Sequence, residues 1–312
     1  MRSNPKTERL SAFRELPALV FLVISVAVLW FRIPNFGSST NMLTMSRDAA
    51  IVGIMGAGMT MVILTSGIDL SVASILAFSA AIMAKLMVAE TSIWIAIPAA
   101  LLVGTACGAG NALLITRLKV PPIIATLGTM GILRAGVTLY TNAKWLGPLP
   151  DSFSFVGTGI TPIILLAVVS IIASLFLLRM RTGRYVHALG GNEEAVRLSG
   201  ISVDRTKFLI YTLNGFLASV AGLICASSMS SAQSNMAMGY ELNVIAAVVI
   251  GGTSIAGGQG SVLGTIIGAA IMAVLYDALI LLGVSIYWHK IITGGVILTA
   301  VLLDRLRLYG RQ

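Results

Sequence analysis

The polar residues best suited to chemistry lie inside or beside long apolar runs. Asp277 lies within one run, Glu241 lies at the edge of another, and Asp69 follows a third run at a turn. Ion-coupled transport places carboxylates at membrane depth, so Asp277 and Glu241 are candidates for ion coupling; the simpler interpretation pairs Asp277 with a polar neighbour. Asp69 also precedes an apolar run, where a carboxylate can cap a helix by accepting backbone N–H bonds. Direct contact with a solute is the alternative for Asp69.

Two single amides, Asn111 and Asn214, also lie in apolar runs. Such amides commonly form hydrogen bonds between membrane helices, and contact with a polar solute is the alternative. An amide that faced lipid would leave its donors and acceptors unpaired. We therefore expect both side chains to face the interior of a helix bundle, and we take them as candidate residues of a translocation pathway.

The sequence contains no motif for several other kinds of chemistry. A P-loop needs Gly-Lys followed by Ser or Thr, and none of the six lysines follows a glycine. His187 and His289 are far apart in sequence, and no cluster of His and Cys has the spacing of zinc ligands. A Gly-x-Ser-x-Gly motif is also missing. We therefore predict no catalytic residue, no metal site and no cofactor.

Composition shows what kind of element must hold these residues. Of the 312 residues, 57% are hydrophobic and 11% are charged, and the mean hydropathy is +0.94. A soluble domain has about 25% charged residues, so a soluble enzyme is excluded. The net charge of +9 does not indicate nucleic-acid binding, because the basic residues lie in short gaps between apolar runs. The solvent for most of this chain must be lipid.

Ten apolar runs approach the length of a transmembrane helix, about 20 residues. We expect an all-α polytopic membrane protein with helices near residues 16–31, 49–65, 72–89, 92–116, 123–140, 160–178, 208–228, 241–255, 262–282 and 287–303. The eighth is the weakest, because Gly251 and Gly252 interrupt it. Many glycines lie in these runs, and Gly264-x-x-x-Gly268 predicts close helix packing. Residues 141–159 are predicted to form a surface loop.

The basic residues predict the orientation of the chain. With a cytoplasmic N-terminus, 15 of the 21 Lys and Arg residues fall on the cytoplasmic side, as the positive-inside rule requires. An even number of spans places both termini on that side. We therefore expect cytoplasmic tails at 1–15 and 304–312, a membrane domain at 16–303, and a long cytoplasmic loop at 179–207.

This loop contains the signature of a short amphipathic helix. Asn192 can cap the helix, and Glu193 and Glu194 suit its first turn. Gly200 suits its C-terminal end. Such a helix either lies on the membrane surface or docks into a partner protein. The candidate contact residues are Gly190, Gly191, Asn192, Glu193, Glu194, Ala195, Val196, Leu198 and Gly200.

The loop also carries a family resemblance. The pattern Gly-x-Asn-x-x-Ala-x-x-x-Ser-Gly-Ile at 190–201 resembles the cytoplasmic loop of sugar ABC importer permeases of the ribose type, within the branched-chain permease superfamily. Further similar patches occur, in the order of the family, at 67–72, 124–129, 247–254, 257–261 and 282–284. With the helices between them, these patches span residues 49–304, which is nearly the whole chain.

The resemblance implies a multi-pass permease of the bacterial inner membrane for a sugar or sugar-like solute. It also implies three kinds of partner: ABC ATPase subunits, a second identical or homologous permease, and a periplasmic solute-binding protein. We expect loop 179–207 to be the contact with the ATPase. The sequence does not choose among pentoses, hexoses, methylpentoses and autoinducer-2. A permease for another solute such as a branched-chain amino acid, an ion-coupled secondary transporter and a membrane scaffold stay open as alternatives.

Overall fold

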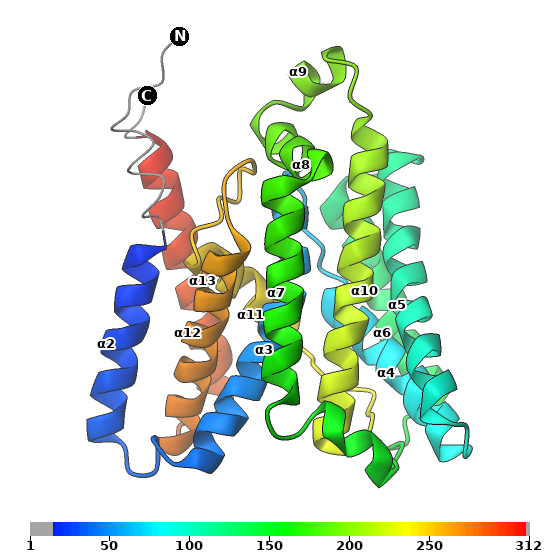
Figure 1. The fold of residues 1–312 in the computed structure, drawn as a ribbon, viewed down its shortest axis with the longest axis vertical. Coiled ribbons are helices and arrows are strands. Elements are labelled where there is room, and N and C mark those ends of the chain that lie inside the picture. The colour runs from blue at the N-terminus through cyan, green and yellow to red at the C-terminus, as the bar shows by residue number, and fades with distance from the viewer. Residues whose placement is uncertain (1–14, 310–312) are drawn as a thin grey trace.

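The computed structural model describes residues 15–309, whose regular elements are all helical (Figure 1). Each of the ten predicted apolar runs contains a helix. The elements are α2 (Leu16–Arg32), α3 (Ser39–Leu64), α4 (Val72–Val88), α5 (Ile93–Thr116), α6 (Pro122–Thr141), η1 (Asp151–Val156), α7 (Thr161–Arg179), α8 (Arg181–Gly191), α9 (Glu193–Leu198), α10 (Val203–Met229), α11 (Tyr240–Ile250), α12 (Val262–Leu281) and α13 (Ile286–Tyr309).

Helix lengths divide the apolar helices into two groups. Six helices of the described chain, namely α3, α5, α6, α7, α10 and α12, are long and apolar enough to cross a membrane. α2 and α4 have 17 residues each, and α11 has 11. At 1.5 Å per residue, α11 extends over roughly 17 Å, about half the thickness of the hydrocarbon core. It therefore needs the irregular segments on either side of it to reach across.

Two helices form the centre of the bundle. Every residue from 50 to 64 of α3 is buried, and α10 packs against α3, α4 and α5. The predicted close packing at glycines is present where α5 meets α10, because a methyl group on Gly104 would lie 2.7 Å from the carbonyl oxygen of Gly215. Gly264 and Gly268 of α12 likewise lie directly against the carbonyl groups of Gly251 and Ala247.

The outer helices expose large apolar side chains. Phe31 of α2, Trp94 of α5 and Leu178 of α7 are 88%, 79% and 71% exposed. Exposed apolar surface on this scale suits contact with lipid rather than water. The fold is thus that of an all-helical membrane protein.

Three segments differ from the sequence expectations. α3 begins at Ser39, about ten residues before its predicted start, because Ser38 accepts the N–H of Asn41 and caps an earlier turn. Segment 141–159 is not a simple surface loop, since it contains η1 and covers the end of α10; there the Ser227 hydroxyl donates to the carbonyl of Phe153 at 2.9 Å. Segment 179–207 contains the unpredicted helix α8 as well as α9.

Figure 1 places α8 and α9 together at one end of the molecule. The start of α2 and the end of α13 face the same end, whereas the α2–α3 connection and η1 lie at the opposite end. The helices between them run roughly along the long axis, and the unwound segment 65–71 joins α3 to α4.

Candidate functional site

Helix α9 forms where the sequence predicts a short capped helix. The side chain of Asn192 accepts the N–H of Ala195 at 3.0 Å, and Gly200 ends the turn with φ +78°. A positive φ is much less costly for glycine than for other residues. The helix therefore has a defined start and end, although it has only six residues.

The apolar side chains of α9 point in two directions. Val196 is buried against Leu189 and Val203, so it fastens α9 to α8 and α10. Ala195 is exposed, and Leu198 is 80% exposed. The exposed apolar side chains of α9 are therefore Ala195 and Leu198, without Val196.

Charged residues add a second attachment for α9. The Glu193 carboxylate accepts from the ammonium group of Lys207 on α10 at 2.7 Å, and from Arg197 at 3.0 Å. The hydrogen bond from Lys207, followed by the neighbouring charges, holds the pKa of Glu193 below its usual range. Glu194 is more exposed and lies 3.9 Å from the guanidinium of Arg197.

The end of α8 contacts two other segments of the chain. Gly190 lies against the carbonyl oxygen of Leu64 and the N–H of Gly258, and a side chain there would overlap both. Gly258 donates to the carbonyl of Leu64 at 3.0 Å, and a ring nitrogen of His187 lies 3.1 Å from the Gly258 carbonyl oxygen. Ser66 donates to the carbonyl of Ala256 at 2.9 Å. We call this meeting of residues 64–66, 187–190 and 256–258 the α8 junction.

Segment 65–71 runs from the α8 junction to a buried polar cluster. Asp69 is fully buried, and its Oδ1 accepts the N–H of Ser71 at 2.9 Å and the Ser71 hydroxyl at 2.6 Å. Its Oδ2 accepts the amide N–H of Asn214 on α10 at 2.8 Å, while the amide of Asn111 on α5 donates to the Ser71 hydroxyl at 2.7 Å. We call Asp69, Ser71, Asn111 and Asn214 the Asp69 cluster.

The Asp69 cluster brings together three residues that the sequence analysis had considered separately. Both amides face the bundle interior, and each binds the α3–α4 connection. Asp69 does accept a backbone N–H near the start of α4, yet Ser71 is the residue before the helix. Ser71 was not among the predicted site residues. The signal for it is the two-residue spacing from Asp69, which lets a carboxylate bind the backbone N–H two positions on.

Several polar atoms near the cluster lack partners. Among the described residues, the oxygens Asn111 Oδ1, Asn214 Oδ1 and Tyr211 Oη are buried without a hydrogen bond. Asn214 Oδ1 lies against Gly58, and the Tyr211 hydroxyl lies against Gly67. No ion pair within residues 15–309 involves Asp69. The cluster is therefore a buried carboxylate that is stabilised by neutral hydrogen-bond donors.

The other intramembrane candidates have different surroundings. Asp277 accepts from the Asn41 amide at 2.7 Å, which is the polar neighbour that the simpler interpretation required. Glu241 is half-buried, and one of its oxygens lacks a partner in the described chain. The nearby Arg134 donates to the carbonyls of Met236 and Ala237 at 2.6 and 3.1 Å. Across residues 15–309 no group of three His, Cys, Asp or Glu side chains could hold a metal ion.

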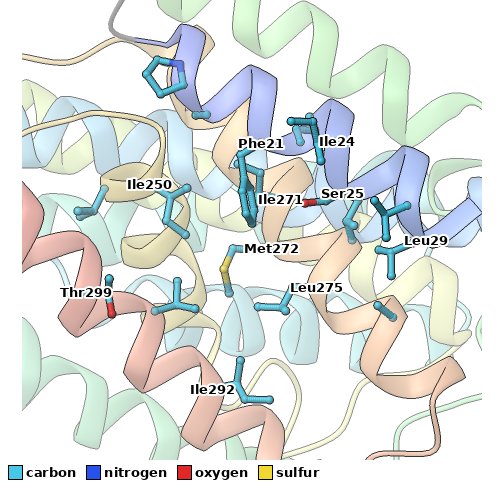
Figure 2. Close-up of a pocket in the computed structure, with 18 of the residues that line it drawn as sticks. Phe21, Ile24, Ser25, Leu29, Ile250, Ile271, Met272, Leu275, Ile292 and Thr299 are labelled. Atoms are coloured by element: carbon cyan, nitrogen blue, oxygen red, sulfur yellow. The ribbon is translucent and has the colours of Figure 1, made fainter. Parts of the chain in front are cut away.

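A large cavity lies between α2, α11, α12 and α13 (Figure 2). Its volume is about 820 Å³, and its walls are mostly apolar. Phe21, Ile271 and Met272 line it, while Ser25 and Thr299 contribute hydroxyl groups. Such a lining suits hydrocarbon and offers few partners to a solute rich in hydroxyl groups.

Comparisons with known proteins match most of the chain. Residues 41–301 match the family model described as the branched-chain amino acid transport system, permease component. The chain is 43% identical to the ribose import permease protein RbsC of Escherichia coli K12, over 93% of both chains. It is 36% identical to the L-arabinose transport system permease protein AraH of the same organism, over 92% of this chain and 89% of the relative. It is 33% identical to the autoinducer 2 import system permease protein LsrC of an Enterobacter species, over 98% and 90% of the two chains. No solved structure matches the fold significantly.

Proposed function

This chain belongs to the permease-component family of the branched-chain amino acid transport system, and from that premise we propose that it is the membrane subunit of an ATP-driven importer for a sugar. The observation that carries the proposal is its 43% identity to a ribose import permease over 93% of both chains. The chain is a transport subunit of the bacterial inner membrane. Its sequence has no Gly-Lys pair for ATP phosphates, so in this proposal a partner ATPase supplies the energy.

Pentoses are the first solutes to test. The ribose and arabinose permeases are 43% and 36% identical to the chain, and the autoinducer 2 permease is 33% identical. A periplasmic binding protein delivers the solute, and a second permease copy or a homologous permease completes the pathway. The test is competition: unlabelled pentose should suppress uptake of labelled ribose by the assembled importer. Uptake of labelled leucine, together with no uptake of any sugar, would instead indicate a branched-chain amino acid permease.

For the topology, we propose that all ten apolar helices cross the membrane, with α11 helped by the irregular segments beside it. The membrane domain is then 16–303, with cytoplasmic tails at 1–15 and 304–312. Two observations support this orientation: 15 of 21 basic residues fall inside, and the start of α2 lies at the same end as α8 and α9 (Figure 1). A reporter that is active only in the periplasm should be silent after Gln312 and active within 141–159. Activity after Gln312 would contradict the ten-helix count.

We propose that loop 179–207 contacts the ATPase through α9. The residues of this proposed coupling site are Gly190, Gly191, Asn192, Glu193, Glu194, Ala195, Val196, Leu198 and Gly200. They act in three ways. Ala195 and Leu198 offer exposed apolar surface to the partner. Val196 and Glu193 fasten α9 to its own chain, and the glycines and Asn192 set the shape of the loop.

A charge on α9 tests this contact. Ala195→Asp places an unpaired carboxylate in an interface that excludes water, which is costly, so the ATPase should no longer copurify with the permease. Glu193→Gln should have a much smaller effect, because Glu193 is bound to Lys207 and Arg197 of its own chain. Ala89→Asp, at an exposed alanine after α4, controls for the added charge. Normal copurification and uptake by Ala195→Asp would move the contact to another cytoplasmic segment, first to 251–261.

We also propose that Asn111 and Asn214 border the translocation pathway. Both amides are fully buried in the present conformation, so a solute reaches them only after segment 65–71 moves away. Their unpartnered oxygens, Asn111 Oδ1 and Asn214 Oδ1, could then accept hydrogen bonds from solute hydroxyl groups.

A further inference from the structure

Segment 65–71 is held at both of its ends by different parts of the fold. At the first end, the α8 junction joins it to the cytoplasmic helix pair: Leu64 accepts from Gly258 at 3.0 Å, and Gly190 lies against the same Leu64 carbonyl. The Ser66 hydroxyl binds Ala256 at 2.9 Å. Because Gly190 lies directly against the Leu64 carbonyl, a displacement of α8 towards α3 pushes residues 64–66.

At the second end, the segment contacts three helices that form the centre and one side of the bundle. Asp69 is bound by Asn214 of α10, and Ser71 is bound by Asn111 of α5. The N–H of Leu70 donates to the hydroxyl of Thr126 on α6 at 3.2 Å. Only Gly67 and Ile68 lie between Ser66 of the α8 junction and Asp69. Such a short connection transmits displacement and does not absorb it.

The chemistry of the Asp69 cluster favours discrete positions over gradual movement. A buried carboxylate that lost its donors would be left unpaired at a large cost. Asp69 is fully buried, and it accepts its hydrogen bonds from neutral groups of Ser71 and Asn214. Segment 65–71 therefore keeps its position until a second arrangement supplies hydrogen-bond donors to the Asp69 carboxylate. This is the behaviour of a two-state element.

We propose that segment 65–71 transmits movement of the cytoplasmic helix pair α8–α9 to the centre of the bundle, and that Asp69 is the positioning residue that locks its inner end. The proposal rests on the proposed function, since the movement at α8 and α9 is supplied by the partner ATPase. It assigns to Asp69 a role in coupling, without contact between Asp69 and the solute or ATP.

The test exchanges the two partners of the central hydrogen bond. In Asp69→Asn, an N–H donor replaces one of the two acceptor oxygens and the charge is lost, so residue 69 no longer accepts from both Ser71 and Asn214 through separate oxygens. In the double variant Asp69→Asn with Asn214→Asp, residue 69 donates to the new carboxylate and the bond is restored in reverse. Asp277→Asn serves as the matched control, because Asp277 also accepts from an asparagine amide but lies outside the segment.

The measurement is solute imported per ATP hydrolysed by the assembled importer in proteoliposomes. Asp69→Asn should reach the membrane at the parent's level, bind the ATPase and continue to hydrolyse ATP. Its ratio of solute imported to ATP hydrolysed should fall about tenfold, which is within the usual range of coupling between two sites. The double variant should recover most of the ratio, and Asp277→Asn should match the parent. Ser66→Ala, which removes only the contact with Ala256, should lower the ratio by a smaller factor.

Two results would overturn the proposal. One is an unchanged ratio in Asp69→Asn. The other is a combination of two observations. Asp69→Asn would lose assembly, hydrolysis and uptake together without recovery in the double variant, and Ser66→Ala would show a normal ratio. Asp69 would then only stabilise the fold. A parent complex that imports no solute would instead contradict the proposed function, and that outcome is seen before any variant is compared.

Discussion

Adding one methyl group at Gly67 should destabilise the protein, and removing one hydroxyl oxygen from Tyr211 should reverse the effect. The backbone of Gly67 is outside the left-handed region, so alanine is conformationally acceptable there. However, a methyl group on Gly67 would overlap the hydroxyl oxygen of Tyr211. Tyr211 is fully buried within α10, so its ring has little room to move.

The magnitude follows from the same contacts. Overpacking of a buried site costs about 1–3 kcal/mol, so Gly67→Ala should lose stability of that order. With phenylalanine at 211 the nearest atoms to the new methyl group are the ring carbon that carried the hydroxyl, at 3.4 Å, and Val62 Cγ1 at 3.5 Å. Both are ordinary contacts. Tyr211→Phe alone should be neutral or stabilising, because the hydroxyl has no partner in the described chain and an unpaired buried polar group costs about 1–3 kcal/mol.

Thermal unfolding of the purified protein in detergent checks this prediction. The unfolding midpoint should fall in Gly67→Ala and return close to that of Tyr211→Phe in the double variant. Gly131→Ala on α6 is the control, since a methyl group there meets no atom within 4 Å. If the two changes were simply additive, the Tyr211 hydroxyl would not be the group that excludes a side chain at Gly67, and the packing described around segment 65–71 would be wrong.

Two further predictions concern α9 and the pathway amides. The lowered pKa of Glu193 means that the folded state favours its charged form, so its contribution to holding α9 on α10 is complete above the unfolded pKa of about 4.3 and is lost as the pH falls through the lower folded value. The hydrogen-exchange protection factors of residues 193–198, measured relative to the intrinsic rate at each pH, should therefore fall only under acid conditions. Glu193→Gln should remove this pH dependence, and a loss of protection near pH 7 would contradict the Lys207 contact. Asn111→Leu should reach the membrane at normal level but import less solute. Asn214→Leu should import less solute and also reach a lower membrane level, because Asp69 Oδ2 loses its donor; normal uptake in both variants would remove these amides from the pathway.

Much of the fold was predictable from the sequence because lipid exposure makes hydrophobic runs long and continuous. All ten predicted runs contain helices, and the cap at Asn192 is present as the residue types predict. The early start of α3 was missed because the polar residues Asn41, Arg47 and Asp48 interrupt the apolar run of the sequence. These groups are tolerated since Asn41 binds Asp277 and Arg47 lies 3.5 Å from Asp48.

The candidate site was less predictable, because its contacts join residues that are far apart in the chain. Asp69 and Asn214 are separated by 145 positions, and Asn111 and Ser71 by 40. Each residue type indicated a buried hydrogen bond, but no local pattern gives the partner. Helix α8 was also missed, because its many polar residues and glycines are typical of a loop. The contacts of Gly190 with Leu64 and Gly258 are long-range and cannot be predicted from the local sequence.

The most direct test of the central claim is uptake of labelled ribose by proteoliposomes that contain this chain, its partner ATPase and the solute-loaded binding protein. The account predicts uptake that requires ATP on the ATPase side and all three components, and that continues when ion gradients are collapsed. Uptake by this chain alone, driven by a proton or sodium gradient, would contradict the account and make Asp277 and Glu241 the residues to study.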